Sequence, residues 1–170
     1  MTETPTVRRT QTSSPWEEAI GSARAVAAGD RVIVAGIMPA TAGGAVPGDG
    51  EPYQQTLSAF RSALGALEPF GLDARSVIRT RMYLSHARDG DEVGRAHREL
   101  FGDVRPAATM VVVAGFVDSR VLVEVEIEAY QGAVASESIR TESAESDSGA
   151  SEAAVPAAGE SGAGELGAAR

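Results

Sequence analysis

The sequence predicts an α+β domain in which two helices cover one face of a mixed sheet. Short runs with alternating apolar residues follow one another along the chain, interrupted by two longer segments with apolar residues every three or four positions. The resulting order is β-β-α-β-α-β-β, which is typical of helices packed on a single sheet. A chain of 170 residues is long enough for one such domain with one hydrophobic core.

The folded part is expected to span residues 13–130. Residues 1–12 are polar, and we expect them to be flexible. Residues 131–170 lack aromatic side chains, carry seven acidic and two basic residues, and consist mainly of Ala, Gly, Ser and Glu. Such a segment buries too little apolar surface to offset the entropy lost on ordering. We therefore expect a disordered acidic tail, which either aids solubility or binds a partner.

The first two strands are predicted at residues 24–28 and 31–36, because the two-residue turn Gly29-Asp30 joins two short, mainly apolar segments. The Gly/Pro-rich segment 41–50 is expected to form a loop. A helix is then predicted from Glu51 to Phe70, where large apolar residues recur at helical spacing. Its expected core face consists of Leu57, Phe60, Leu64 and Leu67.

A third strand is predicted at residues 76–84, and a second helix from Asp89 or Asp91 to Phe101. Acidic residues at the start of this helix favour the positive end of its dipole. Two further strands are predicted at residues 107–114 and 121–130. The face of the third strand opposite Thr80 is expected to carry Val77, Arg79, Arg81 and Tyr83.

Two helices in a domain of this length cover only one face of the sheet. The last two strands are strongly apolar at alternate positions, namely Val111, Val113, Val121, Val123, Val125 and Ile127. We expect the uncovered face to be buried by another subunit, so the sequence predicts a homo-oligomer.

The composition excludes several chemistries. The chain has no Cys, which excludes disulfides, thiolate nucleophiles and Cys-ligated metal centres. All fifteen basic residues are Arg, so Schiff-base catalysis by Lys and the phosphate-binding Lys of a P-loop are excluded. Two His residues cannot form a three-His metal site, and we expect no metal.

Charge and hydropathy restrict the partners. A net charge of −9 disfavours binding to a phosphate backbone. No apolar run reaches the roughly 18 residues that span a bilayer, and no apolar stretch of a secretory signal follows Arg8 and Arg9. We therefore expect a cytoplasmic protein with neither nucleic acid nor membrane as a partner.

Motifs spread from Trp16 to Tyr130 follow the pattern of a known family. They are residues 29–36 (GDRVIVAG), Gln55-Thr56, 79–84 with 94–97 and 101–102, and 105–111 with 122–126. In combination they resemble the Rid family, also called YjgF, reactive intermediate/imine deaminase or endoribonuclease L-PSP. The resemblance implies a chorismate-mutase-like homotrimer with three sheets in an inner barrel and ligand clefts between subunits. The best-known members hydrolyse enamines and imines such as 2-aminoacrylate, with no metal or organic cofactor.

Several family site positions are altered in this chain. Where the family has an Arg that grips the substrate carboxylate, this sequence has Ala108, which cannot bind a carboxylate. Ser22 occupies the position of a family Tyr, and Ala35 that of the Ser in a Ser-Gly pair, while Gly36 is kept. The other residues expected to line the cleft are His86, Thr109 and Met110.

One candidate acid remains. The family glutamate that positions the hydrolytic water matches Glu124 if the preceding turn has one extra residue, and Glu126 if the gap is placed elsewhere. Together with Glu128 these acids share one strand face, where mutual repulsion and burial would raise a pKa into the range of general acid–base catalysis. The competing interpretation pairs them with arginines. The candidates for those pairs are Arg79, Arg81 and Arg120.

Two functions remain open at this point. According to the first hypothesis, the protein is an enzyme that hydrolyses or tautomerises an imine-type or enamine-type metabolite other than 2-aminoacrylate, and backbone N–H groups near Gly36 and Thr109 hold an oxyanion. Alternatively, it is a non-catalytic trimer that binds a neutral or apolar metabolite. The endoribonuclease activity in one family name is disfavoured, since the chain is acidic and lacks a basic patch interleaved with aromatic residues.

Overall fold

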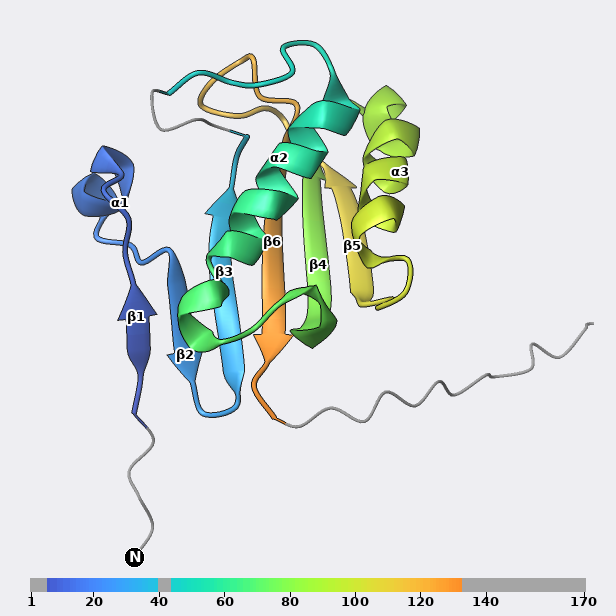
Figure 1. Cartoon of the computed structure of the whole chain (residues 1–170). Helices are drawn as coiled ribbons and strands as arrows, with labels where there is room; N and C mark the ends of the chain where they lie inside the picture. Colours follow the sequence, from blue (N-terminus) through green and yellow to red (C-terminus); the bar gives the residue numbers. More distant parts are fainter. Residues whose placement is uncertain (1–5, 40–43, 133–170) are drawn as a thin grey trace, which may run out of the picture. The chain divides into compact units, whose positions relative to one another are not determined.

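Six strands form one mixed sheet in the order β1-β2-β3-β6-β4-β5 (Figure 1). The computed structural model describes residues 6–39 and 44–132, so the predicted acidic tail lies outside the described residues from position 133 onward. Strands β4 and β5 are parallel, and the other neighbours are antiparallel. The strands are β1 (Arg8–Thr10), β2 (Ala25–Ala28), β3 (Arg31–Ile37), β4 (Val77–Leu84), β5 (Ala107–Val112) and β6 (Val123–Tyr130).

The two main helices, α2 (Pro52–Gly65) and α3 (Gly90–Phe101), cover the same face of this sheet (Figure 1). The predicted α+β architecture is therefore confirmed. The predicted helix 51–70 is divided, because α2 ends at Gly65 and a 3₁₀ turn follows. The 3₁₀ turns are η1 (Glu68–Phe70), η2 (Ala74–Ser76) and η3 (Ala87–Asp89). Within the described part of the chain, no helix combines the length and apolarity needed to span a membrane.

The N-terminal region contains two elements that the sequence analysis missed. Strand β1 pairs antiparallel with β2, so residues 8–10 are ordered by the sheet, contrary to the flexibility predicted for residues 1–12. Helix α1 (Pro15–Ile20) has only six residues, which is too short to show apolar periodicity. Its signals are local ones: Pro15 in the first turn and Gly21, at φ 70°, just after its end.

The core lies between the sheet and the two helices. Its largest wholly buried side chains include Phe60, Phe101, Ile37, Leu67 and Leu84. On β6 the buried positions are Val123, Val125, Ile127 and Ala129, so the uncovered side of this strand carries Glu124, Glu126 and Glu128. The expectation that the valines of β6 face outward was wrong, because they pack under the helices and leave the acids on the open face.

The start of β4 also departs from simple alternation. The pairing of β4 with β6 shifts register between Val77 and Arg79, and Val77 is buried on the same side as Thr80. The sequence analysis had placed Val77 with Arg79, Arg81 and Tyr83, and that assignment was wrong for Val77. An irregularity of this kind inserts a residue and reverses the side to which the strand's earlier residues point.

The side chain of Gln55 holds two loops together inside the protein. It is wholly buried, and its Nε2 donates to the carbonyl oxygens of Gly48 at 3.2 Å and Arg120 at 2.9 Å. Its Oε1 accepts a hydrogen bond from the backbone N–H of Leu122 at 2.8 Å. Gln55 therefore fixes the segment that leads directly into β6, the strand that carries the three acids.

Candidate functional site

The open face of the sheet carries three acids on β6, and two of them are paired with basic residues. Glu128 accepts a hydrogen bond from Arg31 at 2.6 Å, and Arg79 lies 3.9 Å away. Glu126 accepts from Arg81 at 3.0 Å and from the Tyr83 hydroxyl at 3.1 Å. Arg120, the other predicted partner, pairs instead with Asp118 in the preceding loop.

Glu124 is different from its two neighbours. No hydrogen bond or ion pair joins its carboxyl group to any residue that the structure describes. Its side chain is half-buried, and burial, followed by repulsion from Glu126, raises the pKa of the Glu124 carboxyl above its ordinary value. A carboxyl group without a fixed partner and with a raised pKa is a candidate to accept and donate protons in a reaction.

The backbone of Gly36 forms the surface against which this carboxyl group rests. A Cβ atom added at Gly36 would lie 2.0 Å from Glu124 Oε1 and 3.0 Å from its Cδ. The pairing of β3 with β6 shifts register between Val34 and Ile37, so Ala35 and Gly36 are both exposed. Glycine at position 36 therefore makes room for the acid, and the irregularity places this glycine beside it.

Replacing Gly36 with Ala is expected to displace the Glu124 carboxyl group without unfolding the domain, because the new methyl group meets only the end of a flexible side chain. Ligand binding or turnover at this site should fall by about tenfold or more, since a displacement of about 1 Å can cost 10²-fold in rate. The matched control is Gly65→Ala, whose Cβ meets nothing within 4 Å. Equal activity of the two variants would contradict the placement of the site.

The structure brings only some of the predicted site residues together. Ala35, Gly36 and Glu124 are neighbours on the open face. Thr109 also belongs to this face, but it lies on β5, where it pairs with Arg81, which in turn pairs with Glu126. Two strand spacings, or roughly 10 Å, thus separate Thr109 from β6.

Ala108 and Met110 lie on the other side of the sheet from Glu124. They pair with Thr80 and Met82, both of which are buried under the helices. The sulfur of Met110 would lie 3.7 Å from a Cβ added at Gly90, the first residue of α3. Within one chain, Ala108 and Glu124 therefore cannot contact the same ligand.

The remaining candidates lie in loops. Ser22 follows α1, and its backbone N–H is bonded to the carbonyl oxygen of Glu17. His86 is exposed and precedes η3. His97 packs against the rings of Phe60 and Phe101, with its Nε2 2.9 Å from Thr80 Oγ1, and burial lowers the pKa of this imidazole.

The sequence analysis gave no role to Tyr83, which lies beside Glu124 in the candidate site. Tyr83 pairs across the sheet with Glu124 and donates its hydroxyl proton to Glu126. Burial and the Glu126 charge raise the pKa of this phenol. The alternation of Arg79, Arg81 and Tyr83 opposite the alternating acids is the signal that could have revealed it.

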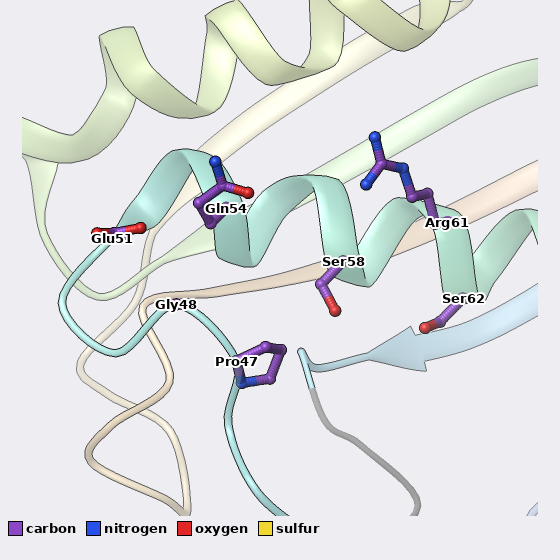
Figure 2. A pocket seen from close by; sticks show the side chains of 7 residues that line it. All are labelled: Pro47, Gly48, Glu51, Gln54, Ser58, Arg61 and Ser62. Carbon is purple, nitrogen blue, oxygen red and sulfur yellow. The ribbon is translucent and has the colours of Figure 1, made fainter.

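A hollow of about 560 Å³ lies elsewhere, along the exposed side of α2 (Figure 2). Its side chains come from α2 and the loop before it, and Ser58 and Ser62 point toward the side on which Pro47 lies (Figure 2). Glu124 does not line it. In the part of the chain that the structure describes, no group of three or more His, Asp or Glu side chains could hold a metal ion.

A family model described as endoribonuclease L-PSP matches residues 14–131, which is more than half of the chain. The protein belongs to the endoribonuclease L-PSP family. An uncharacterised protein of Streptomyces coelicolor is 62% identical over 130 residues, which is 76% of this chain and 96% of that protein.

Two solved structures have a similar fold. A member of the YjgF/YER057c/UK114 family from Mycobacterium tuberculosis is 34% identical, with a TM-score of 0.67 over 74% of this chain and 99% of that one. Escherichia coli TdcF with bound serine is 19% identical, with a TM-score of 0.61 over 74% of this chain and 94% of that one. At that identity the likeness to TdcF concerns the fold alone.

Proposed function

We propose that this L-PSP family protein hydrolyses or tautomerises a small imine or enamine at the Glu124–Gly36 site. The observation that carries the proposal is that Glu124 alone of the three open-face acids is unpaired among the described residues, with a raised pKa. In hydrolysis, the Glu124 carboxylate accepts a proton from the water that attacks the C=N carbon. The protonated carboxyl group passes this proton to the imine nitrogen, which gives a carbinolamine. The carboxylate then takes the hydroxyl proton of the carbinolamine and delivers it to the nitrogen as the C–N bond breaks, so that a carbonyl compound and an amine or ammonia are released.

The surroundings of Glu124 favour a ligand without a carboxylate. Ala35 offers no cation, and Arg31 and Arg81 are already bonded to Glu128 and Glu126. An anionic ligand at Glu124 would meet a carboxyl group whose charge has no counter-ion. The substrate class is therefore an uncharged imine or enamine, in contrast to the amino acid serine that is bound in TdcF.

A comparison of two substrates tests this function. 2-Aminoacrylate, generated from serine, carries a carboxylate, whereas the imine generated by oxidation of a simple amine does not. We expect the neutral imine to be hydrolysed faster, because the carboxylate of 2-aminoacrylate meets the unpaired Glu124 carboxyl group while Arg31 and Arg81 are already bonded to other acids. Release of the carbonyl product is followed for both. Binding of the neutral compound without turnover would show a binding protein instead, and faster turnover of 2-aminoacrylate would contradict the substrate class.

We also propose that the working form is a homotrimer. All six residues of β5 are exposed at this edge of the sheet, including Met110 (38%), Val111 (42%) and Val112 (55%). A second copy placed against this edge would remove these side chains from water. It would also bring its own residues to the open face, so that Ala108 of one copy could approach Glu124 of another.

Light scattering is expected to give a mass about three times the 17.5 kDa of one chain. Val111→Glu should lower this mass, since it places a charge in the proposed contact. Val117→Glu is the control, because Val117 is exposed in the loop after β5. A stable monomer at micromolar concentration would contradict the trimer.

A further inference from the structure

A second cavity lies between the segment that joins β1 to α1 and the C-terminal half of α2. Its volume is about 740 Å³, within the range of small-molecule sites. Its lining includes the polar residues Thr10, Thr12 and Arg24 and the apolar residues Ile37, Ala66 and Pro69. Neither Glu124 nor Gly36 lines it, so it is separate from the site on the open face.

Arg24 is held in a fixed position at this cavity. Its Nε lies 2.6 Å from Glu17 Oε1, and one N–H of Nη2 donates to Thr12 Oγ1 at 3.3 Å. Glu17 is itself buried, and its carboxylate accepts hydrogen bonds from the backbone N–H of Thr12 at 2.8 Å and the Thr12 hydroxyl at 3.0 Å. The network therefore orients the guanidinium group before any ligand arrives.

The outer edge of the same guanidinium group is unused. Among the described residues, the N–H groups of Nη1 and the second N–H of Nη2 have no hydrogen-bond partner. The Arg24 side chain is 26% exposed, so this edge can be reached from the cavity. Two parallel N–H groups of a planar guanidinium match the two oxygens of a carboxylate.

We infer that this cavity is a second ligand site, which takes a small monocarboxylate with an apolar body. The carboxylate lies against the free edge of Arg24, and the apolar part against Ile37 and Pro69. A single negative charge fits better than a phosphate dianion, because Glu17 already supplies one negative charge to Arg24. The inference does not depend on the function proposed for Glu124.

The test compares phenylacetate with phenylacetamide, which has nearly the same shape but no charge. We expect phenylacetate to bind in calorimetry at least tenfold more tightly and to shift the methyl NMR signals of Ile37 and Met38, both of which line the cavity. Arg24→Gln should weaken this binding at least tenfold. The matched control Arg61→Gln, in the hollow of Figure 2, should leave it unchanged.

A second variant distinguishes loss of the ligand contact from a structural effect of removing the Arg24 side chain. Gly65 lines the cavity, and a Cβ added there meets nothing within 4 Å, so Gly65→Leu fills the space and leaves the Arg24–Glu17 pair intact. It should also weaken phenylacetate binding at least tenfold. The inference is overturned if binding persists in both variants, if the amide binds equally well, or if no binding occurs at 10 mM phenylacetate, a concentration typical of very weak ligands.

Discussion

Replacing Glu124 with Gln is expected to slow hydrolysis of a neutral imine about 10²–10⁴-fold, the usual contribution of a general acid–base group. Gln keeps the shape of the side chain but cannot accept the proton of the attacking water. The same substitution in Glu128, which is bonded to Arg31 at the other end of β6, should leave the rate unchanged. Equal rates for the Glu124 variant and the native protein would rule out the proposed acid–base role.

The same Glu124→Gln substitution is expected to raise the melting temperature at pH 7. Because the pKa of this carboxyl is raised in the folded state, its ionisation is less favourable there than in the unfolded chain. The ionised group therefore lowers the free energy of unfolding at pH values above both pKa values. Below about pH 4 the carboxyl is protonated in both states, and the gain should disappear. Calorimetry of the native protein and the variant at pH 7 and below about pH 4 measures the two differences in melting temperature. A lower melting temperature of the variant at pH 7 would contradict the raised pKa.

Gln55→Leu is expected to lower the free energy of unfolding by about 3–5 kcal/mol. The substitution leaves the carbonyls of Gly48 and Arg120 and the N–H of Leu122 without their partner, and a buried unpaired polar group costs about 1–3 kcal/mol. That is a large part of the 5–15 kcal/mol by which domains are usually stable. Urea denaturation measures it.

The neighbouring position supplies the control for this prediction. Gln54 is exposed on the same helix, so Gln54→Leu introduces the same side chain without removing a buried hydrogen bond. Its effect should be within about 0.5 kcal/mol of the native protein. If the two variants unfold at the same urea concentration, Gln55 does not hold the two loops as described.

Most of the fold could be predicted from the sequence because its main elements have strong periodicity. Helix α2 shows Leu57, Phe60 and Leu64 at helical spacing, and Gly29-Asp30 marks a hairpin turn. Strand β1 could not be predicted, because the run Arg-Arg-Thr carries no apolar alternation and depends on the edge of β2 for its hydrogen bonds. The face of β6 was misjudged because alternation alone does not say which of two sides the helices cover.

The candidate site could be predicted from the sequence only as a choice between two acids. Glu124 and Glu126 stand in the same Val-Glu repeat, and nothing local distinguishes them. The difference comes from their neighbours on other strands: Arg81 reaches Glu126, whereas the backbone of Gly36 lies against Glu124. Those relations depend on the irregular pairing at Ala35–Gly36, which is a property of the assembled sheet.

The central place of β6 has a consequence for how the chain reaches its native state. This strand comes last among the described elements, yet it lies between β3 and β4 and joins the two halves of the sheet. During synthesis the hairpin of β2 and β3 can form early, but the halves share no paired strand until β6 emerges. The rate of folding is then governed by contacts between residues far apart in the sequence, which makes folding slow compared with a helical bundle. A nascent chain halted before Val123 would expose the apolar sides of both halves, and we expect such chains to aggregate or to be degraded.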